Sequence, residues 1–384
     1  MRREAKLLNK KKNRILVTST DLMMVQFLVP HIKYLSDKGY NIDVACSNVG
    51  GRIDEVNEKL RDYAENIFVV SLQRSPLSSK NIVGYYEIKK ILEKNHYDLI
   101  WTNEPVMGVA TRLAAKKLKS NGTKVMYMVH GFHFYKGAPK LNWMLYYPIE
   151  KMMSKYCDII TTINHEDFEI AKRFKGKGAK YIHGIGINTD RLNNINEQNI
   201  REEIGLSKED FIVLSVGELN ENKNHRVIIR ALAQVNDKSI HYVVCGKGDQ
   251  LDNLVNLSKE LGIESNVHFL GYRTDVVDIC NQSDLFAFPT FREGLGLAAL
   301  EAMYCGLPLV TSNSRGPVDF MKNGETGFIC DPNNPEEFAR AINIIKNDIE
   351  LQLNMKKTNK ILAYPYCVES VKNEIHSIIE LTLR

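Results

Sequence analysis

Short runs of β-branched and other apolar residues alternate with stretches of helical length from one end of the chain to the other. In the first half these runs predict strands near Arg14–Thr18, Asn41–Cys46, Ile67–Val70, Asp98–Thr102, Lys124–Val129 and Asp158–Ile163. Apolar positions at helical spacing predict intervening helices near Met24–Lys38, Lys80–Asn95, Val106–Ser120 and Lys140–Lys155. Such an alternation is typical of βαβ units, whose strands form parallel sheets.

The same pattern starts again after a polar, asparagine-rich stretch at residues 187–202, which we interpret as a hinge. Strands are predicted near Phe211–Val216, His241–Cys245, Val267–Leu270, Asp284–Phe288 and Pro308–Thr311, and helices near Lys223–Val235, Gln250–Gly262, Thr274–Gln282 and Gly296–Cys305. The last fifty residues, from Pro335, are expected to be helical.

The predicted fold is therefore α/β, with two doubly wound, Rossmann-like parallel-sheet domains that face a central cleft. We place an N-terminal domain at residues 1–190 and a C-terminal domain at residues 191–361. A final helix at residues 362–384 is expected to pack back on the N-terminal domain.

Composition narrows the class of protein further. The chain has 384 residues, 44% of them apolar and 25% charged, and Lys+Arg 51 against Asp+Glu 46 leaves a charge of only +5. That excess is too small and too dispersed for a nucleic-acid-binding protein. Seven cysteines without a C-x-x-C pair argue against a zinc site or a disulfide framework. No apolar stretch approaches the roughly 20 residues that cross a bilayer, so we expect a cytoplasmic protein.

Because ligands of parallel sheets bind beyond the carboxyl ends of the strands, the loops that follow strands are the places to look for chemistry. After the strand that ends at Phe288, a loop presents Glu293 and the next helix presents Glu301. Eight residues correspond to about 12 Å of helix rise, so two carboxylates at this spacing can reach hydroxyls at either end of a diphosphate. The backbone N–H groups between them are expected to bind the diphosphate, because glycines let an anion approach closely. These N–H groups belong to Gly294, Leu295, Gly296 and Leu297.

Two other predicted strand ends carry candidate residues. Gly217 permits a tight turn after its strand, and Lys223, at the predicted start of the next helix, is placed to neutralise phosphate charge. His130 ends a third strand, where an imidazole can hydrogen-bond a sugar hydroxyl or carbonyl. Structural interpretations remain open for these candidates: Lys223 as a solvated surface lysine, Glu293 as a helix-capping glutamate and His130 as a core histidine.

Residues 134–156 mix aromatic residues, methionines and lysines in the way that helices at a membrane surface do. An ordinary core-facing helix has a similar composition. The first fourteen residues are strongly basic, with Arg2, Arg3, Lys6, Lys10, Lys11, Lys12 and Arg14 against Glu4 alone. Together the two segments favour association with a membrane surface.

Several motifs are absent from the sequence. There is no D-x-D pair, so a metal–diphosphate site is not indicated, and no metal or cofactor is expected. The chain also lacks a P-loop and a G-x-S-x-G elbow. Gly246-Lys-Gly248 and Gly184-Ile-Gly186 lack the third glycine of a dinucleotide fingerprint, which leaves a nicotinamide-dependent dehydrogenase with little support.

Taken together, these segments resemble glycosyltransferase family 4, retaining enzymes of the GT-B fold, and most closely its bacterial capsular and exopolysaccharide branch. The resemblance rests on the opening strand, the segment from His130 to Gly137, Gly184-Ile-Gly186, Gly217 to Lys223, the E-x7-E helix, and Gly316 to Gly327. It implies a nucleotide-diphosphate sugar donor held mainly by the second domain, and an acceptor approached from the first.

The resemblance also implies roles for individual residues. Glu293 would contact hydroxyls of the donor sugar, Glu301 would hold the ribose hydroxyls, Lys223 would pair with the diphosphate, and His130 would lie over the sugar. The base would lie near Tyr272 and Arg273. Retention in this family implies a same-face mechanism, in which a donor phosphate oxygen helps to deprotonate the acceptor and no enzymic nucleophile is required.

The chain departs from the family pattern at two places. The family commonly has an arginine after the glycine that matches Gly217, where this chain has Glu218, so another cation has to compensate. The candidates are Arg315, which also follows a strand end, and then Arg292 and Arg226. The glycine-rich turn that is usual after the first strand is replaced by residues 19–23, Ser-Thr-Asp-Leu-Met, which are expected to face the acceptor.

The sequence thus predicts a glycosyltransferase that uses a UDP-sugar and extends a lipid-linked saccharide at the inner face of a bacterial plasma membrane, in capsule, exopolysaccharide or O-antigen biosynthesis. One alternative is a UDP-N-acetylhexosamine 2-epimerase, which shares the two-domain architecture. The other is a two-lobed sugar-binding protein, against which the missing signal peptide, the odd number of cysteines and the cationic loops argue.

Overall fold

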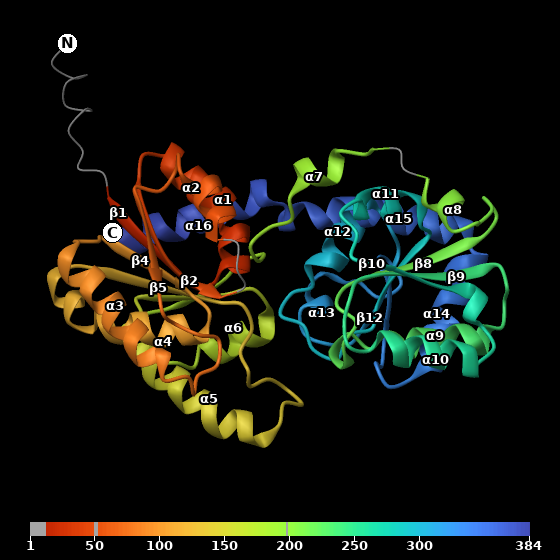
Figure 1. The fold of residues 1–384 in the computed structure, drawn as a ribbon, viewed down its shortest axis with the longest axis horizontal. Coiled ribbons are helices and arrows are strands. Elements are labelled where there is room, and N and C mark those ends of the chain that lie inside the picture. Colours follow the sequence, from red (N-terminus) through yellow and green to blue (C-terminus); the bar gives the residue numbers. More distant parts are fainter. Residues whose placement is uncertain (1–12, 50–52, 197–198) are drawn as a thin grey trace, which may run out of the picture. The chain divides into compact units, whose positions relative to one another are not determined.

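The computed structural model describes residues 13–49, 53–196 and 199–384, and the chain divides into two compact units (Figure 1). The first unit holds the described residues up to Ile185 together with Val371–Arg384, and the second holds Gly186–Ser370. Of the basic residues at the N-terminus, only Arg14 lies within the described part.

The first unit is built on a parallel sheet of seven strands in the order β3-β2-β1-β4-β5-β6-β7. Its strands are β1 (Arg14–Asp21), β2 (Asn41–Val49), β3 (Asn66–Val70), β4 (Leu99–Asn103), β5 (Lys124–Val129), β6 (Ile159–Thr162) and β7 (Ala179–Tyr181). Its helices are α1 (Leu22–Asp37), α2 (Ile53–Leu60), α3 (Lys80–Lys94), α4 (Pro105–Ala114), η1 (Ala115–Asn121), α5 (Lys140–Met153), η2 (Ser154–Tyr156) and α6 (His165–Ala171). The chain leaves β1 toward β2 on one side and returns to β4 on the other, so the strand order reverses between β1 and β4.

The second unit repeats this plan with six parallel strands in the order β10-β9-β8-β11-β12-β13. Its strands are β8 (Phe211–Val216), β9 (Ile240–Cys245), β10 (Val267–Gly271), β11 (Leu285–Phe288), β12 (Leu309–Ser312) and β13 (Gly327–Cys330). The helices and turns before β11 are α7 (Thr189–Asn193), α8 (Ile200–Glu203), η3 (Glu221–Lys223), α9 (His225–Val235), α10 (Leu251–Glu260), η4 (Glu264–Asn266) and α11 (Val276–Gln282). After β11 come α12 (Leu297–Cys305), α13 (Pro317–Phe320), α14 (Pro335–Asn347), α15 (Ile349–Ala363) and η5 (Tyr364–Tyr366).

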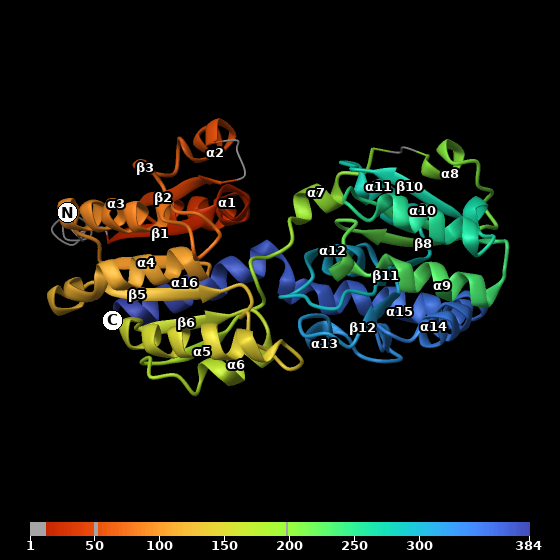
Figure 2. The same ribbon diagram turned by 60° about the horizontal axis from the view of Figure 1, so that its bottom comes forward.

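The central strands are apolar almost throughout because helices pack on both faces of each sheet, as Figure 2 shows. Every residue of β11 is buried, and so is every residue of β5 after Lys124. The last helix, α16 (Val368–Leu383), ends in the first unit, where Asn373 accepts a hydrogen bond from Tyr34 at 2.7 Å and Glu374 contacts His183 Nδ1 at 2.6 Å. Among the described residues, no helix is both long and apolar enough to cross a bilayer.

The expected architecture of two parallel-sheet, Rossmann-like units is confirmed, but several short elements were not predicted. The strands β7 and β13 have only three and four residues and end their sheets, so they lack the long apolar run that marks a central strand. The helices α2, α6, α7, α8 and α13 are likewise no longer than eight residues. The helix predicted to continue to Ser120 is α-helical only to Ala114 and tightens into the 3-10 turn η1.

Candidate active site

In the second unit the strand order reverses between β8 and β11, and open α/β sheets bind ligands at this kind of switch point. The loop after β8 runs from Gly217 to Asn224, and the loop after β11 runs from Pro289 to Gly296. These are the loops that carry Lys223 and Glu293, which lie 70 residues apart in the sequence. The fold therefore brings the two main candidate loops to the same edge of the sheet.

Lys223 and Glu293 form an ion pair, with Nζ donating to Oε2 at 2.6 Å. Each side chain keeps 22% of its surface exposed, so solvent reaches both groups. The ammonium group also lies 5.0 Å from the centre of the Phe288 ring, a favourable cation–π geometry. A Cβ on Gly217 would lie 3.5 Å from Lys223 Cε, an ordinary van der Waals contact, so the lysine stem runs alongside the end of β8.

Lys223 does not begin a helix, as the sequence pattern predicted. It ends the 3-10 turn η3, and α9 begins at His225, because Asn224 adopts a left-handed conformation with φ 54° between them. The Asn224 amide donates to the backbone oxygens of Pro289 at 3.1 Å and Pro332 at 2.8 Å. The lysine is thus placed by this buried asparagine rather than by the first turn of a helix.

Asn222, like Asn224, ties the two loops together and was missed in the sequence. Its amide donates to the Arg292 oxygen at 2.9 Å, and its backbone oxygen accepts from the Phe291 N–H at 2.8 Å. Thr290 adds a hydroxyl that donates to the same Asn222 oxygen at 3.1 Å. Three asparagines at alternate positions, 220, 222 and 224, in a loop after a buried strand were the available signal, since asparagine side chains commonly bond to nearby backbone in turns.

The helix α12 begins at Leu297, after Gly296 with φ 99°. The predicted 12 Å of helix rise between Glu293 and Glu301 is therefore wrong, because Glu293 lies in the preceding loop and only the residues from Leu297 onward are helical. A Cβ on Gly316 would lie 2.9 Å from both Cα and O of Leu295, so the loop after β12 packs directly under this segment. The glycines at 296 and 316 thus fix the backbone that opens α12.

Glu301 lies on α12 and forms an ion pair with Arg191 of α7. Burial raises the pKa of Glu301, and the charge and hydrogen bond of Arg191 oppose that rise. Arg191 was not among the expected site residues, because nothing in the polar stretch around it distinguishes it from a surface arginine. Its contact with Glu301 orients the carboxylate that the family resemblance assigns to the ribose.

The remaining candidates of this unit have different surroundings. Tyr272 follows β10 and is 70% exposed, so its ring is open to a ligand. Arg273 donates hydrogen bonds to Asp275 and Glu203, with N–O distances from 2.6 to 3.0 Å, and these bonds raise its pKa. It thereby connects the loop after β10 with the end of α8. Arg315 is buried at the start of the turn into α13.

The lone G-x-G pair after β9 has a packing role. A Cβ on Gly246 would lie 1.8 Å from the Gly217 oxygen, and one on Gly248 would lie 2.2 Å from the Leu219 oxygen. The two glycines therefore let the loop after β9 lie directly against the loop after β8. Glu218, at the position of the usual family arginine, accepts a hydrogen bond from Asn220 at 2.9 Å.

His130, the candidate of the first unit, follows β5 and contacts Asn103 at the end of β4, with Nε2 at 3.0 Å from Oδ1. The Asn103 amide nitrogen donates to the Thr18 oxygen at 3.1 Å, so its Oδ1 is the acceptor for His130 and Nε2 carries the proton. Burial lowers the pKa of His130 to about 4, which keeps the ring neutral near pH 7. Nδ1 is consequently an acceptor, suited to a hydroxyl donor.

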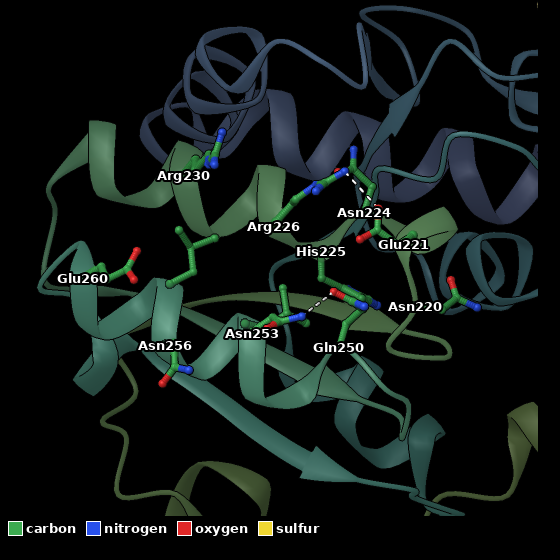
Figure 3. A pocket seen from close by; sticks show the side chains of 12 residues that line it. Asn220, Glu221, Asn224, His225, Arg226, Arg230, Gln250, Asn253, Asn256 and Glu260 are labelled. Carbon is green, nitrogen blue, oxygen red and sulfur yellow. Dashed lines mark hydrogen bonds and ion pairs between the residues drawn. The ribbon is translucent and has the colours of Figure 1, made fainter.

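A polar cavity of about 370 Å³ opens between α9 and α10, lined by residues that include Arg226, Arg230, Gln250 and Asn253 (Figure 3). Arg226 pairs with Glu221 at 3.3 Å, and Asn253 donates to Gln250 at 3.0 Å. Arg226, one of the cations considered to compensate for Glu218, lines this cavity, whereas the other residues expected to bind the donor do not. It lies beside η3, but neither Lys223 nor Glu293 lines it.

All seven cysteines are free thiols. Across residues 13–49, 53–196 and 199–384, no three His, Cys, Asp or Glu side chains are grouped so that they could hold a metal ion.

Known proteins match the chain in both units. The family model described as Glycosyl transferase 4-like matches residues 15–164, and the model described as Glycosyl transferases group 1 matches residues 196–361. The glycosyltransferase EpsD of Bacillus subtilis (strain 168) is 35% identical over 347 residues, which cover 88% of this chain and 89% of that protein. The UDP-Gal:alpha-D-GlcNAc-diphosphoundecaprenol alpha-1,3-galactosyltransferase of Escherichia coli is 27% identical over 338 residues, 85% of this chain and 86% of that protein.

Among solved structures, Anabaena HepE, crystallised in complex with UDP and glucose, gives a TM-score of 0.77 at 19% identity and covers 96% of this chain and 99% of its own. That likeness establishes the GT-B fold. With both family models and a relative of 35% identity over most of its length, the chain belongs to glycosyltransferase family 4, retaining transferases of the GT-B fold.

Proposed function

We propose that the protein transfers a sugar from a UDP-sugar to a lipid-linked saccharide, in capsule, exopolysaccharide or O-antigen biosynthesis. The observation that carries the proposal is the Lys223–Glu293 ion pair at the β8/β11 switch point, next to the glycine-bounded start of α12. A cation and backbone N–H groups at one sheet edge are the groups that a diphosphate requires.

In this proposal Lys223 and the N–H groups of residues 294–297 bind the diphosphate and stabilise its charge as it departs, without a metal ion. Glu293 accepts hydrogen bonds from the donor sugar, Glu301 holds the ribose hydroxyls, and Tyr272 lies by the base. Arg315 supplies the charge that Glu218 does not. Because Glu293 is already held by an ammonium group, it is better suited to orient a hydroxyl than to attack a sugar carbon.

The relatives support this choice of substrates. The Escherichia coli relative is named for UDP-Gal as donor and a GlcNAc-diphosphoundecaprenol acceptor, and the HepE crystals contain UDP. Family membership sets aside the sugar-binding protein considered from the sequence. The epimerase alternative is separated by isotope exchange at C2 of the donor sugar, which an epimerase catalyses without any acceptor.

A lipid-linked acceptor is most accessible at the membrane surface, and α5 has the form of a surface-binding helix. Leu141, Met144, Leu145 and Met152 are each at least half exposed on α5, at the spacing of one helical stripe. The opposite side is anchored by Glu150, which accepts a hydrogen bond from the buried Arg112 at 2.9 Å. Lysines 136, 140, 151 and 155, in α5 or within four residues of it, are also exposed. We propose that this stripe enters the inner face of the plasma membrane and that the lysines meet anionic lipid.

The donor is tested with a thermal-shift panel of UDP, GDP and ADP and their hexose derivatives. Because a ligand that binds only the native state stabilises it by RT ln(1 + [L]/Kd), UDP at 100 times its Kd adds about 2.7 kcal/mol. We expect UDP and a UDP-sugar to raise the melting temperature, with the GDP and ADP compounds inert at equal concentration. A shift with GDP or ADP alone would contradict the UDP assignment.

The membrane proposal is tested by co-sedimentation with anionic liposomes. Replacing both Met144 and Leu145 with glutamate removes two apolar contacts worth about 1.5–3 kcal/mol each, so the bound fraction should fall at least tenfold. Ile361→Glu is the matched control, since Ile361 is 70% exposed on α15 in the second unit. Equal binding of the double variant and the wild type would refute the role of α5.

A further inference from the structure

The first unit has its own switch point, between β1 and β4, and Glu104 lies there. Its Oε2 accepts hydrogen bonds from the Ser19 hydroxyl at 2.7 Å and from the Thr20 N–H at 2.6 Å. Ser19 and Thr20 belong to the segment that replaces the usual glycine-rich turn of the family. The carboxylate is therefore fixed over the carboxyl end of β1, in the region where sheets of this topology bind ligands.

The backbone of Glu104 is strained, with φ 63° and ψ 157°, a region that essentially only glycine occupies. Helix α4 starts at Pro105, yet the Glu104 side chain makes no capping hydrogen bond to that helix. Glycine would suit this backbone better than glutamate, and a capping role does not account for the carboxylate. A strained residue with a carboxylate held in one orientation is typical of a functional position.

The neighbouring strand ends complete a surface that is lined by hydrogen-bond acceptors. Asn103, which precedes Glu104 at the end of β4, hydrogen-bonds His130 at the end of β5. Because β4 and β5 are paired, with about 5 Å between strand axes, His130 and its Nδ1 acceptor lie one strand away from Glu104. Glu104 and His130 are half-buried, whereas Ser19, Thr20 and Asn103 beneath them are fully buried. Two half-buried hydrogen-bond acceptors thus lie at neighbouring strand ends beside a buried polar floor, an arrangement that complements a polyol with hydroxyl donors.

We propose that Glu104 binds a hydroxyl group of the acceptor saccharide and thereby orients it beside His130. This inference rests on the proposed function, and on the family resemblance, which implies that His130 lies over the transferred sugar. Burial raises the pKa of Glu104, although the hydrogen bonds from Ser19 and Thr20 and the charge of Arg74 oppose the rise. A sugar hydroxyl that donates to the carboxylate would replace the hydration that burial removes.

The test uses Glu104→Gln in the full-length protein, because the amide oxygen can still accept from Ser19 and Thr20 while the charge is lost. Transfer is measured with UDP-hexoses and a panel of prenyl-diphosphate-linked GlcNAc, GalNAc and glucose, and UDP affinity and donor hydrolysis are measured separately. We expect the acceptor KM to rise at least tenfold, with UDP affinity and hydrolysis within twofold of the wild type. Glu87→Gln is the matched control, since Glu87 also accepts from a backbone N–H and a hydroxyl, both of Ser71, at 2.6 and 3.1 Å.

The possible results distinguish a failure of this inference from a failure of the proposed function. A Glu104→Gln protein whose acceptor KM stays within twofold of the wild type overturns the inference but leaves the proposed function intact. Equal losses of UDP affinity and transfer overturn it as well, because they indicate a structural role. A wild-type protein that neither binds UDP nor uses any acceptor contradicts the proposed function itself. Should Glu104→Gln fold poorly, Glu104→Gly relieves the strained φ and is expected to give the same rise in acceptor KM.

Discussion

Replacing Glu293 with glutamine is expected to lower sugar transfer without weakening UDP binding, whereas general damage to the active site would lower both. In the free protein the Lys223 ammonium group is held by the Glu293 carboxylate at 2.6 Å, so a diphosphate has to compete with that carboxylate for the same cation. Glu293→Gln removes the competing charge, and UDP should bind as tightly as before or more tightly. Sugar transfer should fall, because the carboxylate proposed to orient the donor sugar is lost.

The size of these effects follows from the exposure of the pair. Exposed ion pairs contribute about 0–1 kcal/mol, and removing one partner of a buried pair costs about 3–5 kcal/mol. With 22% of each side chain exposed, Lys223→Met or Glu293→Gln should each lower the free energy of unfolding by about 2 kcal/mol. Lys223→Met also removes a charged hydrogen bond to the diphosphate, worth about 1.5–3 kcal/mol, so the Kd for UDP should rise about 10- to 100-fold. Glu293→Gln should lower that Kd by up to about fivefold.

The assay is a double-mutant cycle on two quantities, urea unfolding and calorimetric UDP affinity, at low ionic strength. Unfolding should show that the double variant loses less than the sum of the single variants, by about 1–2 kcal/mol. Lys322→Met is the control, because Lys322 is an exposed lysine whose ammonium group lies 3.8 Å from the exposed Glu325. If Glu293→Gln weakens UDP binding as much as Lys223→Met does, Glu293 serves to position the lysine, and its assignment to the donor sugar is refuted.

Three further predictions concern the surroundings of the ion pair. Gly316→Ala should lower stability by about 2 kcal/mol and weaken UDP binding, because its Cβ would lie 2.9 Å from Leu295 at φ 86°; unchanged urea unfolding would contradict the packing described. Arg191→Met removes the cation that opposes the raised pKa of Glu301, so Glu301 should become protonated at a higher pH than in the wild type. UDP affinity, followed by calorimetry, should therefore fall more steeply as the pH drops from 7.5 toward 5, and parallel profiles would contradict this. His130 has a pKa lowered to about 4, so transfer between pH 5.5 and 8 should lack an inflection near 6.5; an inflection that disappears in His130→Gln would contradict its neutral state.

The sequence pattern predicted the architecture well where strands are buried on both faces. The strands at 124–129 and 211–216 have the predicted bounds, since a continuous apolar run between polar ends leaves little ambiguity. Two edge strands, β3 and β10, were predicted as well, whereas Ala179–Tyr181 and Gly327–Cys330 were missed because three or four residues at the border of a sheet show neither a long run nor a clear alternation. The alternation of strands and helices along the chain thus predicted the layers, while the shortest edge strands depended on tertiary pairing.

Candidate site residues could be proposed one by one from the sequence, but their contacts could not. Lys223 and Glu293 stood out because each follows a buried strand, yet their ion pair depends on β8 and β11 lying side by side, which only the sheet order determines. Arg191 carried no signal, since its partner lies 110 residues away. Glu104 was also missed, because a positive φ is expected at glycine and the sequence gives no reason to expect it at a glutamate.

The most direct test of the account is the position of UDP in crystals of the protein grown with the nucleotide. We predict that the diphosphate lies within hydrogen-bond distance, about 2.7–3.2 Å, of Lys223 Nζ and of the N–H groups that open α12. A nucleotide seated elsewhere, for example in the polar cavity between α9 and α10, would contradict the central claim that the β8/β11 switch point binds the donor.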